Sequence, residues 1–227
     1  MALTPAALVL LDLMGAALAV VIAAFFAASW RRSGDNTHLL FMVGFLLLAG
    51  GVAASSTSQF DLQRPAEAWD ALRVAAHTSG ALVLAFAYLS ASRHGDARPW
   101  TVVGWVAAGM GLLFAVLYWL VPPSAALPSL TSASFAAHAV QFVAYAACVA
   151  LSLEGFRRRP ALDNALVPTA FLAWAFSKYT WLLIDVSADT ALVPFVLVWR
   201  FAALGLLLLA LALPPPIPAG GEDAAPA

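Results

Sequence analysis

The chain has 227 residues, of which 63% are hydrophobic and only 10% are charged, whereas soluble domains carry about 25% charged residues. Too few charges are present to cover the surface of a water-soluble fold, so the composition indicates a membrane protein. The formal net charge is −1, and no basic cluster is large enough for a nucleic acid. We therefore expect the lipid bilayer, a small-molecule ligand, and a protein partner or a second copy as partners, and no nucleic acid.

Seven stretches of the chain are long and apolar enough to span a bilayer, which takes about 20 residues. The sequence therefore predicts an all-α, polytopic membrane protein with seven transmembrane helices, over about 5–29, 38–56, 67–91, 100–121, 131–154, 163–185 and 191–213. The first is expected to be a mature helix and not a cleaved signal peptide, because MALTP has no basic residue and Asp12 interrupts the run. Prolines end the last span, so 214–227 is expected to be a disordered cytoplasmic tail.

The arginines are distributed unevenly between the two sides of these spans. The first, third and fifth loops hold Arg31, Arg32, Arg93, Arg98, Arg157, Arg158 and Arg159, whereas the opposite side holds only Arg64 and Arg73. Lys and Arg in short loops favour the cytoplasm. This bias predicts a multi-pass protein of the inner cell membrane of a bacterium or archaeon, with its N-terminus outside and its C-terminus inside.

A weak internal repeat relates the two ends of the chain at an offset of about 127 residues. Arg31-Arg32 before Asp35-Asn36 corresponds to Arg158-Arg159 before Asp163-Asn164, and Arg73 before Ala75-Ala76 corresponds to Arg200 before Ala202-Ala203. The pattern predicts a 3+1+3 parallel repeat, in which the fourth helix is a connector; chance alignment of Ala/Leu-rich helices is the alternative. The layout resembles that of sugar transporters built on a 3+1+3 plan, although their Pro-Gln signatures are absent here.

Ionisable residues inside spans are costly in lipid and are functional candidates by default. At a rise of about 1.5 Å per residue, six of them fall in one layer of the outer half of the bundle: Asp12, Arg73, His77, His138, Lys178 and Arg200. Helical spacing also places Trp174, Lys178, Trp181 and Asp185 on one stripe, and Ser134, His138, Gln141 and Tyr145 on another. The sequence therefore predicts a single polar pocket that opens outward.

Each of these residues also has a structural interpretation. Lys178 can snorkel to the interface or pair with Asp185. Arg73 and Arg200 can neutralise Asp12 and Asp70 and so link helices. His77 and His138 lie at similar depth, as two axial ligands of a b-type haem would. Hydrogen-bonded core histidines or a proton relay are the alternatives, and no sequence signature for haem accompanies them.

The seven-residue spacing of Trp174 and Trp181 resembles the retinal-pocket helix of microbial rhodopsins, and Arg73 near the outer end of the third helix suits that comparison. That family carries its Schiff-base lysine on the seventh helix, where this chain has Arg200. A retinal-binding lysine at Lys178 would depart from the family, so the resemblance does not extend to the cofactor.

These patterns predict that a small polar or anionic ligand, or protons, binds in an outward-facing pocket. The first functional hypothesis is therefore a transporter. The expected ligand-binding residues are Arg73, His77, His138, Gln141, Trp174, Lys178, Trp181 and Arg200, with Asp12 and Asp185 as counter-charges. Because cations outnumber acids, an anion is favoured. A sensor or accessory subunit is the second hypothesis, and a haem or chromophore protein the third. No metal cluster, phosphate loop or catalytic motif nominates an enzyme.

Overall fold

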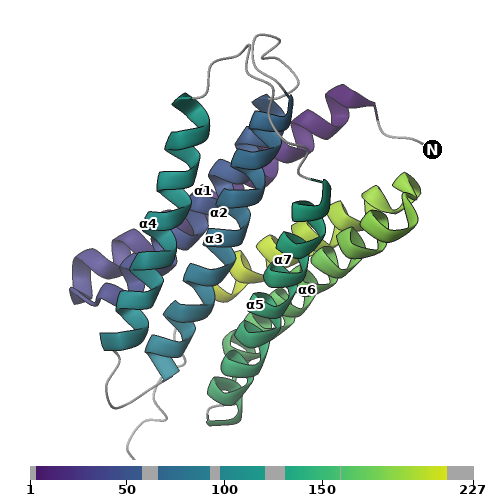
Figure 1. Ribbon diagram of the computed structural model, residues 1–227. Coiled ribbons are helices and arrows are strands. Elements are labelled where there is room, and N and C mark those ends of the chain that lie inside the picture. The colour runs from purple at the N-terminus through teal and green to yellow at the C-terminus, as the bar shows by residue number, and fades with distance from the viewer. Residues whose placement is uncertain (1–3, 58–65, 93–97, 121–130, 159, 214–227) are drawn as a thin grey trace, which may run out of the picture.

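The computed structural model describes residues 4–57, 66–92, 98–120, 131–158 and 160–213. This part of the chain is all-helical, without strands (Figure 1). Its elements are α1 (Pro5–Ser33), α2 (Asn36–Thr57), α3 (Ala66–Ser92), α4 (Arg98–Leu120), α5 (Thr131–Arg158), α6 (Leu162–Ser187), the short 3₁₀ turn η1 (Thr190–Leu192) and α7 (Val193–Ala212). The predicted tail over 214–227 lies outside the described residues.

Five of these helices are long and apolar enough to cross a membrane: α1, α2, α3, α5 and α7. Helix α4 contributes a shorter apolar stretch over Pro99–Leu113. Large hydrophobic side chains cover the outside of the bundle, among them Met110 at 67% exposure on α4 and Val143 at 64% on α5. Exposure of so much apolar surface to water is unfavourable, whereas contact of this surface with lipid tails is favourable. The helices are therefore those of a membrane-embedded protein.

Six helices form a closed ring. Within it, α1 packs on α2 and α2 on α3, while α5 packs on α6 and α6 on α7. The two groups of three meet where α3 contacts α5 and where α1 contacts α7. Helix α4 lies outside this ring against α3 and α2, and Figure 1 shows it at the edge of the bundle, away from α6 and α7.

Aromatic side chains fill the middle of the ring. The rings of Tyr145 and Trp174 stack in parallel at 5.2 Å between centroids, and Phe171 lies 6.1 Å from Trp174. Phe45 of α2 reaches Trp174 at 6.0 Å, so aromatic contacts connect opposite sides of the ring. Tyr145 and Phe171 are almost fully buried. Aromatic pairs of this kind stabilise a core beyond their buried area.

The helix ends extend past the predicted spans where basic residues precede a turn. Helix α1 continues through Arg31 and Arg32 to Ser33, and Gly34 then ends it in the left-handed conformation at φ 68°. Basic side chains in a last turn complement the negative end of the helix dipole, and glycine adopts this φ without strain. The sequence predicts an end near residue 29, because Arg31 and Arg32 are charged and suit a loop; the structure places both in the last turn of the helix.

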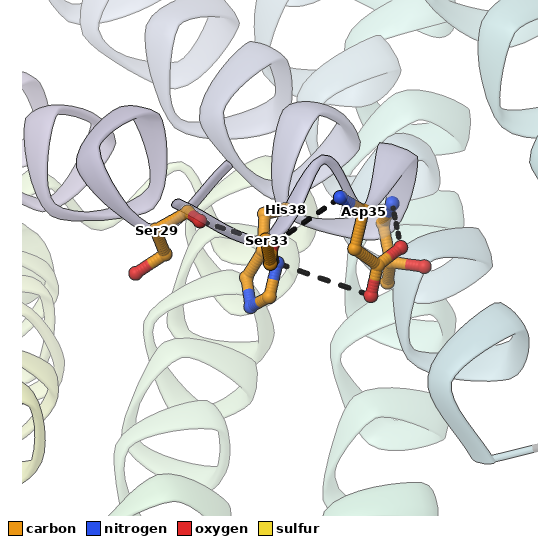
Figure 2. Close-up of polar contacts among 5 residues, drawn as sticks. Ser29, Ser33, Asp35 and His38 are labelled. Atoms are coloured by element: carbon orange, nitrogen blue, oxygen red, sulfur yellow. Dashed lines mark hydrogen bonds and ion pairs between the residues drawn. The ribbon is translucent and has the colours of Figure 1, made fainter. Parts of the chain in front are cut away.

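A short polar network closes the turn between α1 and α2. The Ser33 hydroxyl donates to the Ser29 carbonyl at 3.0 Å and lies 3.1 Å from Nδ1 of His38 (Figure 2). The Asp35 carboxylate accepts from the Thr37 backbone amide at 2.8 Å, in the manner of a helix N-cap. These contacts satisfy backbone groups at both helix ends, so the chain reverses direction in two residues.

A candidate ligand-binding cavity

A cavity of about 300 Å³ lies inside the six-helix ring, beyond the aromatic core. Its walls come from α1, α2, α3, α5, α6 and α7, close to the N-terminal ends of α1, α3, α5 and α7. The eight expected ligand-binding residues and one expected counter-charge all line it: Asp12, Arg73, His77, His138, Gln141, Trp174, Lys178, Trp181 and Arg200. Asp185 is the one predicted residue outside the lining. The structure thus brings the predicted set together around one space.

Lys178 lies deep in this cavity, with 5% of its surface exposed. Its Nζ is 3.3 Å from Nδ1 of His77, and no carboxylate of the described residues forms an ion pair with it. Both structural interpretations of Lys178 are therefore wrong for this structure: the side chain does not snorkel to the surface, and Asp185 is not its partner. A buried ammonium group needs a counter-charge, and the cavity is where one can enter.

The His77 ring reaches Lys178 because α2 has no side chain opposite it. A Cβ placed on Gly51 would collide with the His77 ring and would lie 3.2 Å from the Arg73 carbonyl oxygen. Glycine therefore permits close contact between α2 and α3 at the level of the cavity. Gly51 was missed by the sequence analysis, where its only signal is the Gly50-Gly51 pair inside an apolar span.

Arg73 and Arg200, both partly buried, each have a carboxylate partner. Arg200 of α7 donates through Nη2 to Asp12 of α1 at 2.6 Å, and both side chains are largely buried. Arg73 donates to Asp70, one turn earlier on α3, at 2.8 Å and 3.1 Å. The expected partners are present, but Arg73 and Asp70 lie on the same helix, so the expectation that this pair links two helices is wrong. The Asp12–Arg200 pair does join the two groups of three helices across the ring.

A histidine–carboxylate contact lies beside Trp181. His138 of α5 contacts Asp185 of α6 through Nδ1 at 2.8 Å, and its ring stacks on Trp181 at 5.4 Å. The guanidinium of Arg73 lies 5.8 Å from the Trp181 ring centre, within the range of a cation–π contact. Asp185 thus acts on the cavity through His138. These contacts link α3, α5 and α6 on one side of the site.

Several buried polar atoms around the cavity have no hydrogen-bond partner among the residues that the structure describes. The Gln141 amide donates to the Thr78 hydroxyl at 2.8 Å, but its Oε1 is unpaired. Nε of Arg200 and Nε2 of His77 are likewise unpaired. An unsatisfied buried polar group costs about 1–3 kcal/mol, so the site is polar enough to favour an occupant that pairs with it.

The histidine geometry does not favour haem. Nδ1 of His77 contacts Lys178, and its Nε2 edge packs against α2 at Gly51. His138 commits Nδ1 to Asp185. Two axial ligands must present ring nitrogens to one iron, and His77 presents neither nitrogen to open space. Among the described residues, no group of three His, Cys, Asp or Glu residues could hold a metal ion.

The aliphatic half of the cavity was not anticipated from the sequence. Side chains of α1, α2 and α7 form it: Leu8, Val9, Leu48, Val52, Val193, Val196, Leu197 and Leu204. In a chain so rich in Leu, Val and Ala, no composition signal separates a cavity wall from the core or from the lipid-facing surface.

Comparisons of the chain with protein-family models, with curated proteins and with solved structures find no match.

Proposed function

We propose that this chain is a seven-span membrane protein that binds a small anion in the cavity and carries it across the membrane. The observation that carries the proposal is Lys178, a buried lysine without a carboxylate partner among the described residues, which lines the same cavity as two arginines. An anion that enters would supply the missing charge, and charge-assisted hydrogen bonds are the strong ones.

The length and surface of α4 and α6 support seven spans. With 23 and 26 residues, they extend about 35 Å and 39 Å at 1.5 Å per residue, longer than a hydrocarbon core of roughly 30 Å. Helix α6 has a polar inner face, but its outer face is an exposed apolar stripe of Leu172, Phe176, Tyr179 and Leu183. A helix with this division suits a position between lipid and a polar cavity.

The arginine bias supports an orientation with the N-terminus outside. With that orientation, the end of the bundle that holds the cavity faces out, and the last turns of α1 and α5, which hold Arg31, Arg32, Arg157 and Arg158, face the cytoplasm. The aromatic core then separates the cavity from the cytoplasmic end. This describes an outward-facing site that is closed below.

The relation between the two three-helix groups supports transport over binding alone. If α1–α3 repeat as α5–α7, then the α1–α7 contact is equivalent to the α5–α3 contact, and both are present. Arg73 and Arg200, equivalent in the repeat, both line the cavity. In transporters with repeats, sites lie at the repeat interface, and one repeat moves against the other.

The test measures binding and uptake separately with the purified full chain. Chloride, phosphate and acetate are titrated against the tryptophan fluorescence, and uptake of the labelled anions is followed in proteoliposomes. Lys178→Gln is expected to weaken binding about tenfold to hundredfold, since a hydrogen bond to a charged group contributes about 1.5–3 kcal/mol. Arg158→Gln, at the far end of α5 and half exposed, is the control.

Anion binding and uptake that both fall in Lys178→Gln, and persist in Arg158→Gln, would support the proposal. Binding without uptake by the chain alone would contradict transport and favour the sensor or subunit hypothesis. Binding that is unchanged in Lys178→Gln would contradict the site itself.

A further inference from the structure

The two sides of the cavity differ in chemistry. Toward α3, α5 and α6 the wall carries the polar groups of Arg73, His77, Gln141 and Lys178 beside the rings of Trp174 and Trp181. Toward α1, α2 and α7 it is mainly aliphatic, formed by Val9, Leu48, Val52, Val193, Val196 and Leu197. Asp12 and Arg200 are the charged members of this second side, and they pair with each other. The cavity is thus amphipathic across its width.

An inorganic anion fits only the polar side. It would pair with Lys178 but would leave the aliphatic wall in contact with water, and that surface would add nothing to its affinity. A ligand with an apolar part would bury the same wall, and each buried methylene contributes about 0.8 kcal/mol. The composition of the wall therefore selects an organic anion over an inorganic one.

The volume limits the size of that ligand. A cavity of about 300 Å³ corresponds to about ten groups of the size of a water molecule, at about 30 Å³ each. A carboxylate uses three non-hydrogen atoms of such a ligand, so about seven remain for the apolar part. Eight-carbon octanoate is at this limit.

On the basis of the proposed function, we propose that the ligand of this cavity is an amphipathic organic anion, a carboxylate on an aliphatic or aromatic body of up to about seven carbons. The carboxylate lies against Lys178, a buried lysine that has no carboxylate partner among the described residues. The apolar body lies along Val52 of α2 and Val196 of α7.

The experiment is a chain-length series on the full chain in detergent, with acetate, butyrate, hexanoate, octanoate and decanoate, and with chloride and phosphate as inorganic probes. Affinity is expected to rise about fourfold per methylene, the ratio that corresponds to 0.8 kcal/mol, and to stop rising near octanoate. Chloride and phosphate are expected to bind no more tightly than acetate.

Val196→Thr tests the wall with little change in volume. Val196 is 3% exposed and lines the cavity, whereas Val198, two residues on, is 61% exposed on the outside of α7. Val196→Thr is expected to weaken hexanoate binding severalfold and to leave acetate binding unchanged, because it places a hydroxyl against the apolar body. Val198→Thr is the matched control, and thermal unfolding checks that both variants fold.

The outcomes separate this inference from the proposed function. A flat series, or tighter binding of chloride or phosphate than of hexanoate, overturns the amphipathic ligand while anion binding stands. A rise that continues at full slope through decanoate overturns the size limit. No binding of any probe overturns the proposed function, and the inference with it.

Discussion

The His77 ring lies where only a glycine on the neighbouring helix leaves room. Its Nδ1 contacts Lys178, and its far edge packs against Gly51. The placement of one imidazole thus depends on an absent side chain on another helix. Because His77 lies within hydrogen-bond distance of Lys178, a change at Gly51 affects the candidate site without altering any charged residue.

Gly51→Ala is expected to lower stability by about 1–3 kcal/mol, because the added methyl overpacks a filled space, and to weaken anion binding by displacing His77 from Lys178. Thermal unfolding in detergent and fluorescence titration measure the two effects. Gly50→Ala is the matched control: nothing lies within 4 Å of its Cβ position, and alanine is the better helix former by about 1 kcal/mol. Equal behaviour of the two variants would contradict the close contact of His77 with α2.

At the scale of elements, α6 has two faces with opposite chemistry. One carries Trp174, Lys178 and Trp181 into the cavity, while the other exposes Phe176 at 43% and Leu172 at 45% on the outside. Below the cavity, its inner face joins the aromatic core through Phe171 and the stacked Tyr145 of α5. The same helix therefore provides the floor and one wall of the site.

Phe171→Ala is expected to open this floor. Cys148, the only cysteine of the chain, is fully buried one turn beyond Tyr145 on α5, so its thiol reports on access through the aromatic core. In proteoliposomes, a maleimide reagent should label Cys148 faster in Phe171→Ala than in the parent chain. The loss of the ring should also cost about 3–5 kcal/mol of stability.

Phe176→Ala is the control for this experiment, because it removes the same side chain from the outer face of the same helix. Equal labelling of Cys148 in the two variants, at a temperature where both are folded, would show that Phe171 does not close the path between the cavity and Cys148.

At the scale of the whole molecule, the candidate site lies between the two three-helix groups of the ring. The candidate site draws on both three-helix groups, with Asp12, Arg73 and His77 from α1 and α3, and His138 and Lys178 from α5 and α6. Among the described residues, helix packing joins the groups at α1–α7 and α3–α5, and side-chain contacts such as that of His77 with Lys178 also cross between them. Relative movement of the groups would therefore change the site.

Seven spans with an outside N-terminus predict a cytoplasmic C-terminus. A green fluorescent protein fused after Ala227 should fluoresce, and alkaline phosphatase fused at the same point should be inactive. The prediction follows from the arginine bias, with seven arginines at the helix ends and connections of one side against two on the other. An active phosphatase fusion would contradict it and would invert the sidedness of the cavity.

Much of the architecture could be predicted from local pattern. Apolar runs near 20 residues locate the helices to within a few residues, because lipid tolerates little else. The layer of charged residues could also be predicted, since depth along a helix follows from counting residues. The Arg31-Arg32 boundary was less predictable, because a basic pair suits a loop and a helix C-terminus alike.

By itself, the sequence determined the all-helical class with long apolar helices, the helix order and the position of each polar residue along its helix, because these depend on composition and on spacing within one helix. Only the tertiary structure decided which charges pair: Asp185 with His138, Asp12 with Arg200, and Lys178 with no described carboxylate. It also decided that aliphatic side chains of α1, α2 and α7 complete the cavity. The physical reason is that pairing and packing depend on how helices rotate and meet across the ring, and spacing along one helix carries no information about its neighbour.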